Sequence, residues 1–281
     1  MDEKKLKIGI QGVKAAFHDV AARQYFGNDK IELAEFRDFR SMSKAVAAGK
    51  VDFAMMAIEN TLAGSLLPNY GLLEEYGLNI IGEEYLRIQM QLMALPREPI
   101  GNIEQVISHP IALSQCGQFL DEYPDWKVTE ADDTASSARL ISKKKLKGIA
   151  AIASSLAAKT YGLKIIAPSI ETNKKNYTRF LAISKTKTDI ANANKASLRL
   201  VLNHKPAALS KALAVIGNKG LNLSKIQSVP IIGQPYEYAI HLDVLFEKRE
   251  TFNQAIAELN PLCINLKVLG TYQQGNKPVL K

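Results

Sequence analysis

The chain has 281 residues, of which 47% are hydrophobic and 23% charged, with a formal net charge of +8. This length and composition predict two or three compact units rather than a disordered chain. The start is charged, and no apolar stretch approaches the roughly 20 residues of a membrane-spanning helix, so we expect neither secretion nor membrane insertion. Cys116 and Cys263 stand far apart and form no CxxC motif, which disfavours a disulfide framework or zinc site and favours the cytoplasm.

The positive charge is scattered along the chain. Basic residues alternate with acidic ones, and the densest run, 143–147, has the pattern of a solvated helix end. This pattern disfavours nucleic acid as a partner. A modest positive field also favours a small anionic substrate.

The first two thirds of the chain alternate short apolar runs with helical patterns, which is typical of a parallel sheet covered by helices. We predict strands at 7–11, 53–58, 105–108, 127–131, 148–153 and 180–184. We predict helices at 41–49, 111–123, 134–145 and 155–161. The fold class is therefore α/β.

Polar residues follow four of these predicted strands. In such sheets, ligands bind beyond the carboxyl ends of the strands, where helix N-termini offer free N–H groups. One cleft can therefore collect these residues, which are Glu59-Asn60-Thr61, Ser108-His109-Pro110, Asp132-Asp133-Thr134 and Ser154-Ser155.

Two extended segments, 78–94 and about 164–180, lie between the groups of strands and predict two crossings between two lobes. Lobe one would hold residues 1–83 with 175–188, and lobe two residues 84–174. After a polar linker at 186–194, the pattern from residue 195 to 281 becomes strand, helix, strand, strand, helix, strand. This order predicts a ferredoxin-like βαββαβ domain.

Four motifs occur in order along this framework and are followed by a fifth in the C-terminal domain: IENTLAG (58–64), SHPIALSQC (108–116), DDTASSA (132–138), NYTRF (176–180) and NLSKIQSVP (222–230). Together they resemble prephenate dehydratase with a C-terminal ACT regulatory domain. The resemblance implies a two-lobed catalytic region like a periplasmic binding protein at 1–188 and an ACT domain at 195–281. It also implies conversion of prephenate to phenylpyruvate in phenylalanine biosynthesis, with phenylalanine as effector, in a homodimer or homotetramer.

The reaction removes a carboxylate and a hydroxyl from the prephenate ring, which becomes aromatic, so it needs no electron-sink cofactor. The sequence carries no metal or nucleotide motif, and we expect no cofactor. Because residue 7 already enters the first strand, we also expect no chorismate mutase region in front, although some relatives carry one.

The family pattern points to a set of site residues. The expected catalytic residues are Thr178, Arg179, Glu59 and Asn60, and the expected substrate-binding residues are Thr61, Gly64, Thr134 and Phe180. In an extended NYTRF segment, Thr178 and Phe180 share one face and Arg179 points the other way. Thr178 is the leading catalytic candidate, as a hydrogen-bond donor to the leaving oxygen while another group supplies the proton.

Several of these residues have structural alternatives. Arg179 either anchors a substrate carboxylate or forms an ion pair with Glu59 or an Asp, and Glu59 is either a proton donor or an acceptor for backbone N–H groups. Asn60 and Thr61 either donate to substrate or cap the following turn, and Thr134 caps the helix that it opens. His109 precedes Pro110 at a predicted helix start, which favours capping over catalysis.

The chain departs from the family at three places. Relatives carry a Gly and a small hydroxyl residue where this chain has Ala15-Ala16. In the ACT domain, Gly-Ala-Leu is replaced by Ala207-Ala208-Leu209, and Glu-Ser-Arg-Pro by Gln-Ser-Val-Pro at 227–230. Since Asn222 and Leu223 remain, we expect phenylalanine to bind these effector residues, but weakly.

Two other functions fit the same pattern. A non-catalytic protein that binds small anions has the same lobed architecture. An arogenate dehydratase acts on a substrate with an amino group, which needs an acidic partner that the sequence alone does not assign.

Overall fold

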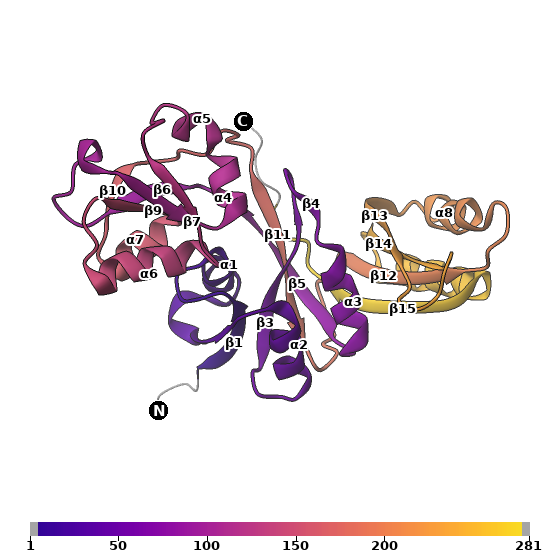
Figure 1. The fold of residues 1–281 in the computed structure, drawn as a ribbon. Coiled ribbons are helices and arrows are strands. Elements are labelled where there is room, and N and C mark those ends of the chain that lie inside the picture. The colour runs from indigo at the N-terminus through magenta and orange to yellow at the C-terminus, as the bar shows by residue number, and fades with distance from the viewer. Residues whose placement is uncertain (1–4, 277–281) are drawn as a thin grey trace.

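The structure, a computed structural model, describes residues 5–276, so residues 1–4 and 277–281 of the predicted domains lie outside the described residues. Three units follow one another in Figure 1: lobe two on the left, lobe one in the centre and the C-terminal domain on the right. Each unit contains one sheet. Along the described part of the chain, no helix combines the length and apolarity that crossing a bilayer requires.

Lobe one is built on a mixed sheet with the strand order β2-β1-β3-β11-β5, in which β4 also pairs with β3. Its strands are β1 (Leu6–Gln11), β2 (Ile31–Phe36), β3 (Phe53–Asn60), β4 (Gly64–Ser65), β5 (Asn79–Arg87) and β11 (Tyr177–Ser184). Its helices are α1 (Phe17–Phe26), α2 (Phe39–Ala47) and α3 (Leu67–Glu75). Strand β11 runs antiparallel between β3 and β5, although it is far from both in the sequence.

Lobe two has the strand order β10-β6-β9-β7-β8. Its strands are β6 (Gln91–Ala94), β7 (Gln105–Ser108), β8 (Lys127–Glu130), β9 (Ile149–Ala153) and β10 (Lys164–Ala167). Its helices are α4 (Pro110–Gln115), α5 (Gly117–Leu120), α6 (Thr134–Lys144) and α7 (Ser155–Tyr161). Short 3-10 turns lie at Asn28–Lys30 in lobe one, Ile100–Asn102 in lobe two and Asn260–Leu262 in the C-terminal domain.

The predicted mixed α/β class and all six predicted strands are confirmed to within a few residues. The predicted helix 111–123 is wrong in its continuity, because Cys116 leaves helical geometry and separates α4 from α5. Helices α1 and α3 and strand β2 were not predicted from the sequence. The N-cap residues of α1 and α3 are Ala16 and Leu66, neither of which makes a side-chain cap, so both helices lack that N-terminal signal, although α3 has a Pro in its first turn.

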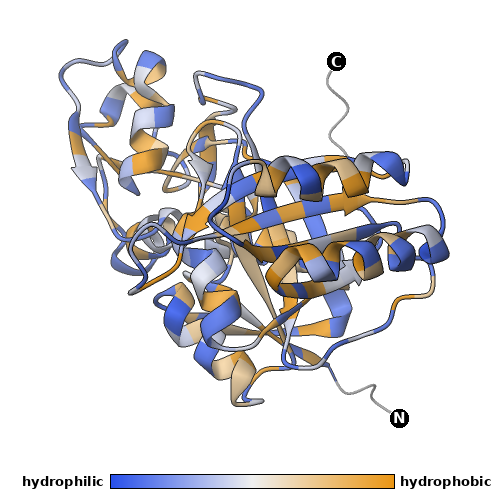
Figure 2. Cartoon of the chain, turned by 90° about the vertical axis from the view of Figure 1, so that its right-hand side faces the viewer, coloured by the Kyte–Doolittle hydropathy of each residue, from blue (hydrophilic) through white to orange (hydrophobic). Residues whose placement is uncertain are grey.

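The C-terminal domain has the predicted βαββαβ order. It consists of β12 (Lys195–Leu202), α8 (Ala208–Asn218), β13 (Asn222–Pro230), β14 (Tyr238–Leu245), α9 (Arg249–Leu259) and β15 (Cys263–Tyr272). The antiparallel sheet has the order β13-β14-β12-β15, and apolar stripes on its strands and helices are visible in Figure 2. Leu198, Leu242, Ala212 and Phe252 are among the buried residues that form its core.

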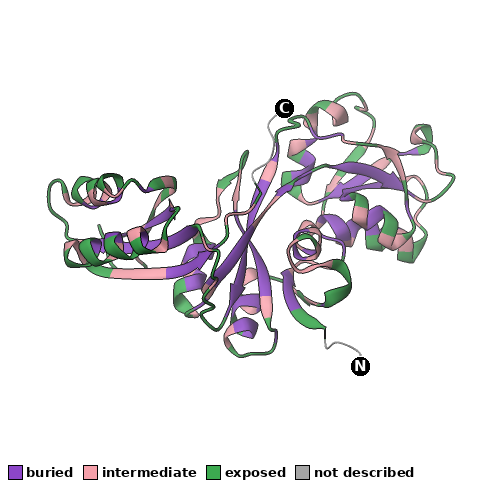
Figure 3. Cartoon of the chain, turned by 180° about the vertical axis from the view of Figure 1, so that it is seen from behind, coloured by how far each residue is buried: buried purple, intermediate pink, exposed green. Residues whose placement is uncertain are grey.

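The C-terminal domain packs against lobe one through β15 and β5. At Gly270 the two backbones approach so closely that a Cβ atom would lie 1.9 Å from the carbonyl oxygen of Ile80. Any side chain there would separate the two units. The central strands of lobe one are accordingly buried along most of their length, as Figure 3 shows.

Candidate active site

A cavity of about 380 Å³ lies between the two lobes. Lobe one contributes the end of β1, the start of α1, residues of β3 and β11, and the turn after β3. Lobe two contributes the start of α4 and the segment that leads into α6. Its polar lining consists of Gln11, His18, Asn60, His109, Gln115, Asp132, Asp133, Thr134 and Thr178.

Thr178 and Asn60 form a hydrogen-bonded pair on neighbouring strands at this cavity. The Asn60 Nδ2 group donates to Thr178 Oγ1 over 2.9 Å, while Asn60 Oδ1 accepts from the backbone N–H groups of Leu62 and Ala63. Because the Thr178 oxygen accepts this bond, its own hydroxyl proton is free to be donated elsewhere. Thr178 is 9% exposed, so a bound molecule would meet this donor largely shielded from water.

An amide relay connects this pair to lobe two. Asn60 Nδ2 also donates to Asn176 Oδ1 over 2.8 Å, and Asn176 Nδ2 donates to Gln115 Oε1 over 2.8 Å. Asn176 is fully buried, whereas Gln115 lies at the end of α4 and lines the cavity. Both residues lie inside the motifs at 108–116 and 176–180, but neither was predicted as a site residue, because nothing in a single sequence shows that 115 and 176 meet.

Phe180 and His18 form an aromatic wall of the cavity. Their ring centroids are 5.0 Å apart with an interplanar angle of 86°, the edge-on arrangement that aromatic pairs favour. Burial lowers the pKa of His18 to about 4, so the imidazole is neutral near pH 7. His18 was not among the site residues predicted from the sequence. Only its neighbours Ala15 and Ala16 were named there, as departures from the family pattern.

The first turn of α1 presents backbone donors at the cavity. Its N-cap residue, Ala16, provides no side-chain acceptor, and Phe17 and His18 of the first turn line the cavity. Uncapped N–H groups at a helix start carry partial positive charge and favour an anion.

At α4 and α6, the other two helices that start at the cavity, the capping residues match the predicted ones only in part. His109 Nδ1 accepts from the Ile111 N–H over 3.3 Å, which supports its predicted capping role. At α6, the cap is Asp133 rather than Thr134, since Asp133 Oδ1 accepts from the Ser136 N–H over 2.8 Å. Thr134 is the first residue inside the helix and lines the cavity, and burial raises the pKa of Asp133.

Arg179 and Glu59 lie on the opposite face of the same strands. Arg179 is 4% exposed; its Nε donates to Glu83 over 2.7 Å, and its Nη1 pairs with Asp243 of the C-terminal domain. Burial disfavours the charged guanidinium, but Asp243 and Glu83 outweigh that effect and hold the pKa of Arg179 well above its usual value. The expected substrate contact is therefore replaced by the structural alternative, an ion pair with an Asp.

Glu59 pairs with the C-terminal domain as well. Its Oε2 lies 2.7 Å from Lys225 Nζ, and it does not line the cavity. The two residues expected to carry charge at the site, Arg179 and Glu59, thus point away from it because side chains alternate along a strand.

Thr61 and Gly64 shape the turn after β3. Thr61 Oγ1 accepts from the Tyr177 N–H and donates to the Lys175 carbonyl, each over 3.0 Å, so its hydroxyl is engaged within the protein. Gly64 pairs with Asn60 and has a φ of 81°, in the region that favours glycine. Neither residue lines the cavity.

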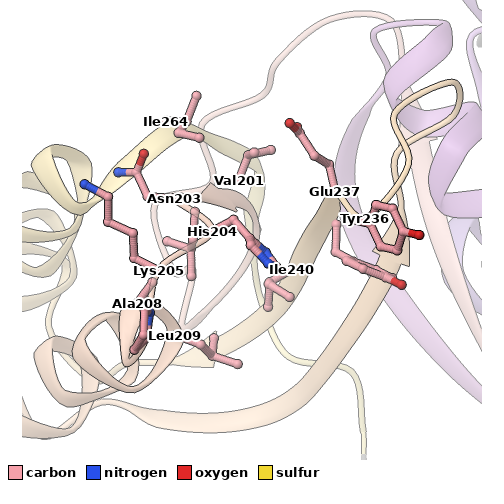
Figure 4. A pocket seen from close by; sticks show the side chains of 13 residues that line it. Val201, Asn203, His204, Lys205, Ala208, Leu209, Tyr236, Glu237, Ile240 and Ile264 are labelled. Carbon is pink, nitrogen blue, oxygen red and sulfur yellow. The ribbon is translucent and has the colours of Figure 1, made fainter.

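The expected effector residues separate into two groups within one chain. Ala208 and Leu209 line a second cavity of about 450 Å³ in the C-terminal domain, and Ala207 directly precedes α8. Figure 4 shows His204 and Lys205 near this helix start and Tyr236 and Glu237 on the loop before β14. Asn222 and Leu223 begin β13, after the far end of α8, and Asn222 lines a separate cavity of about 320 Å³.

Metal ligands do not gather in this structure: along residues 5–276, no group of three or more His, Cys, Asp or Glu side chains is placed to hold an ion.

The family model described as prephenate dehydratase matches residues 8–188. A bifunctional chorismate mutase/prephenate dehydratase of Enterobacter agglomerans is 30% identical over 96% of this chain and 71% of its own length. The chloroplastic arogenate dehydratase/prephenate dehydratase 2 of Arabidopsis thaliana is 35% identical over 95% of this chain and 73% of its own length.

Solved structures share this fold, among them the following three. One is described as GqqA, a novel type of quorum quenching acylase, with a TM-score of 0.86, 28% identity and coverage of 98% of this chain and 100% of the other. The prephenate dehydratase of Staphylococcus aureus has a TM-score of 0.83 and 26% identity, covering 95% and 100% of the chains. The prephenate dehydratase of Arthrobacter aurescens in complex with L-Phe has a TM-score of 0.84 and 26% identity, covering 95% and 90%.

Proposed function

We propose that this chain, which belongs to the prephenate dehydratase family, catalyses the decarboxylative dehydration of prephenate to phenylpyruvate. The reaction breaks the bond to the ring carboxylate, whose electron pair enters the ring as carbon dioxide leaves. The bond to the ring hydroxyl breaks on the other side, and the departing oxygen takes a proton to form water. The main task of the protein is to hold the ring and assist the departing oxygen.

The observation that carries this proposal is the Thr178–Asn60 pair at the cavity between the lobes. Asn60 occupies an acceptor site of the Thr178 oxygen and so directs the hydroxyl proton outward, where it can donate to the departing oxygen. Asn60 thus acts by positioning Thr178, because its amide is engaged within the protein. A donor fixed before the reaction stabilises developing charge without reorganisation at that moment.

The lining of the cavity suits the loss of the ring carboxylate. Phe180, Met90 and Ile88 provide apolar surface, which does not stabilise a carboxylate that must lose its charge in the transition state. The free N–H groups at the start of α1 can bind the other carboxylate of prephenate, on its pyruvyl side chain, which keeps its charge throughout the reaction. The two carboxylates thereby find different surroundings.

The direct test is to incubate purified, chelator-treated protein with prephenate and follow the formation of phenylpyruvate. We expect turnover without an added metal or nucleotide. Binding of prephenate without any product would favour the non-catalytic alternative, and activity restored only by a divalent ion would contradict the cofactor-free mechanism.

We further propose that the C-terminal domain is an ACT domain that binds phenylalanine between two copies of the chain. The support is geometric: Ala208 and Leu209 lie at one end of α8, and Asn222 and Leu223 lie beyond the other end. One copy alone therefore does not bring the expected effector residues together, and a homodimer or homotetramer can. The Arthrobacter aurescens enzyme described above is named as a complex with L-Phe.

Calorimetry with phenylalanine and sedimentation of the free and saturated protein test this regulatory proposal. We expect an oligomer and binding weaker than that of relatives with the full motif. Submicromolar binding would show that the altered residues do not matter, whereas a monomer that binds nothing at millimolar phenylalanine would contradict the proposal.

A further inference from the structure

The hairpin of β3 and β4 presents Asn60 to the cavity between the lobes. The two strands pair at the base of the hairpin, where Glu59 lies opposite Ser65. Asn60 Oδ1 holds the turn by accepting from two of its backbone N–H groups, while Asn60 Nδ2 donates to Thr178 Oγ1 over 2.9 Å. The direction of the Thr178 hydroxyl therefore depends on the geometry of this hairpin.

A lysine of the C-terminal domain holds the base of the hairpin. Lys225 Nζ, on β13, donates to Glu59 Oε2 over 2.7 Å and to Ser65 Oγ over 3.0 Å, so one cation contacts both strands. It also lies 5.7 Å from the ring centroid of Tyr70 on α3. The side chain of Lys225 is 7% exposed, and a cation so shielded from water requires such partners.

The residue that Lys225 contacts on β3 is the direct neighbour of Asn60. In the pairing of β11 with β3, Arg179 lies opposite Glu59. At the next position Thr178 lies opposite Asn60, and the register shifts just beyond Arg179. Side chains alternate along a strand, so the first pair faces the C-terminal domain and the second faces the cavity. Because a register shift disrupts regular pairing locally, a displacement of Glu59 would be passed along the backbone to Asn60.

We propose that Lys225 is a positioning residue for the reaction: by holding Glu59 and Ser65, it fixes the hairpin so that Asn60 directs the Thr178 hydroxyl into the cavity. The inference rests on the proposed function, since it assumes that this hydroxyl donates to the departing oxygen. Lys225 does not line the cavity and acts only through the hairpin. The C-terminal domain thereby takes part in forming the site itself.

The test compares Lys225→Met with Arg199→Met. Arg199 is a matched control, because it also joins the C-terminal domain to a glutamate of lobe one. Its Nη2 lies 2.8 Å from Glu74 on α3, and its side chain is 6% exposed. Both variants remove one shielded cation and one contact between the domains, but Glu74 lies outside the hairpin that carries Asn60.

Lys225→Met should lower kcat for prephenate about three- to tenfold with little change in KM, because a misplaced donor weakens an interaction made in the transition state. Arg199→Met should leave kcat unchanged. In a Thr178→Ala background, Lys225→Met should cause no further loss, because the donor that it positions is already absent. Loss of domain packing alone would not depend on Thr178 in this way.

Hydrogen exchange of residues 60–66 gives a second measurement, which does not depend on activity. Exchange of this segment should become about threefold or more faster in Lys225→Met, because the turn opens more often when the base of the hairpin is released. It should stay unchanged in Arg199→Met.

An equal fall of kcat in both variants would overturn this inference, because Lys225 would then serve only the packing of the domains. So would a further loss of kcat in the Thr178→Ala background, or unchanged exchange of residues 60–66 in Lys225→Met. Failure of the unaltered protein to convert prephenate would instead remove the proposed function, and hydrogen exchange would still decide whether Lys225 holds the hairpin.

Discussion

At the scale of single residues, Thr178 carries the proposed chemistry, since it is the hydroxyl whose proton the local hydrogen bonds leave free. Thr178→Ala should lower kcat by about 10²-fold or more, because it removes a donor to the departing oxygen. The fold should persist, since the neighbouring strand contacts are made by the backbone. Steady-state kinetics and circular dichroism measure the two effects.

The controls for Thr178 are chosen from the same molecule. Thr129→Ala makes the same change on β8 outside the cavity, and His109→Ala removes a cap rather than a donor, so both should cost far less. Near-normal turnover in the Thr178 variant would remove it from the mechanism. Collapse of activity in a folded His109 variant would instead identify the imidazole as the proton donor.

The backbone conformation of Ala207 leads to a prediction about stability. Its φ is 62°, in the left-handed region that alanine disfavours, and its methyl group is exposed. Ala207→Gly should therefore raise the free energy of unfolding of the C-terminal domain by about 1 kcal/mol. Urea unfolding measures it. Ala212→Gly, inside α8, should instead lower stability by about 1 kcal/mol or more.

Ala15 has the same left-handed backbone conformation as Ala207, but its replacement by Gly is not expected to raise stability. Its φ is 72°, yet its methyl group is fully buried between the lobes. Removing a buried methyl costs about 1 kcal/mol, which offsets the relief of backbone strain. Ala15 and Ala207 thus both lie at left-handed backbone positions, which favour glycine over alanine.

At the scale of elements, β3 and β11 serve two sites with their two faces. Asn60, Thr178 and Phe180 face the cavity, whereas Glu59 and Arg179 contact the C-terminal domain. The sequence predicted the alternation in β11 because a strand has a period of two. It did not identify Lys225 or Asp243 as the partners, because residues that distant in sequence meet only through the packing of two domains.

This arrangement predicts that Arg179 contributes to stability rather than to chemistry. Arg179→Met leaves Glu83 and Asp243 without a buried guanidinium and should lower the free energy of unfolding by about 3–5 kcal/mol. Arg40→Met, which breaks an exposed ion pair with Glu75, should lower the free energy of unfolding far less, because solvent screens that pair. Urea titration of both variants measures the difference, and equal small effects would show that the buried cluster is energetically neutral.

The elements that the sequence could not predict have identifiable physical causes. Helices α1 and α3 start without a capping side chain. The helix predicted at 111–123 breaks at the buried Cys116, directly before Gly117, and glycine is a poor helix former. Of the four polar groups expected in one cleft, three contribute to the cavity, through Asn60, His109 and 132–134, whereas Ser154 caps α7. Whether each polar side chain there faces a ligand or its own backbone depends on turn geometry, as Thr61 shows.

At the scale of the whole molecule, His241 makes the junction between domains sensitive to acid. It is 5% exposed on β14 and lies 4.6 Å from Tyr70 of lobe one, centroid to centroid. Burial lowers the pKa of His241 to about 4, and the nearby charges of Arg199 and Lys225 lower it as well. The carboxylate of Asp243 opposes them and raises this pKa.

The unfolded chain binds a proton at His241 near pH 6.5, whereas the folded protein resists it until about pH 4. The free energy of unfolding should therefore fall as pH drops through this window, by up to about 3 kcal/mol from this residue. His241→Gln should flatten part of the slope and leave the part due to His18, whose pKa is lowered in the same way. Urea unfolding at pH 7 and pH 5 measures it, with the exposed His204→Gln as the control, and an unchanged slope in the His241 variant would contradict the assignment.

The position of β11 also determines the order in which the chain can fold as it leaves the ribosome. This strand lies between β3 and β5 in the sheet of lobe one, yet it is synthesised after all the strands of lobe two. The nascent N-terminal segment therefore waits with an open gap in its sheet, exposing unpaired edges, while lobe two emerges as one contiguous run from β6 to β10. Lobe two should become resistant to protease first, and the Thr178–Asn60 pair can form only once residue 178 has left the exit tunnel.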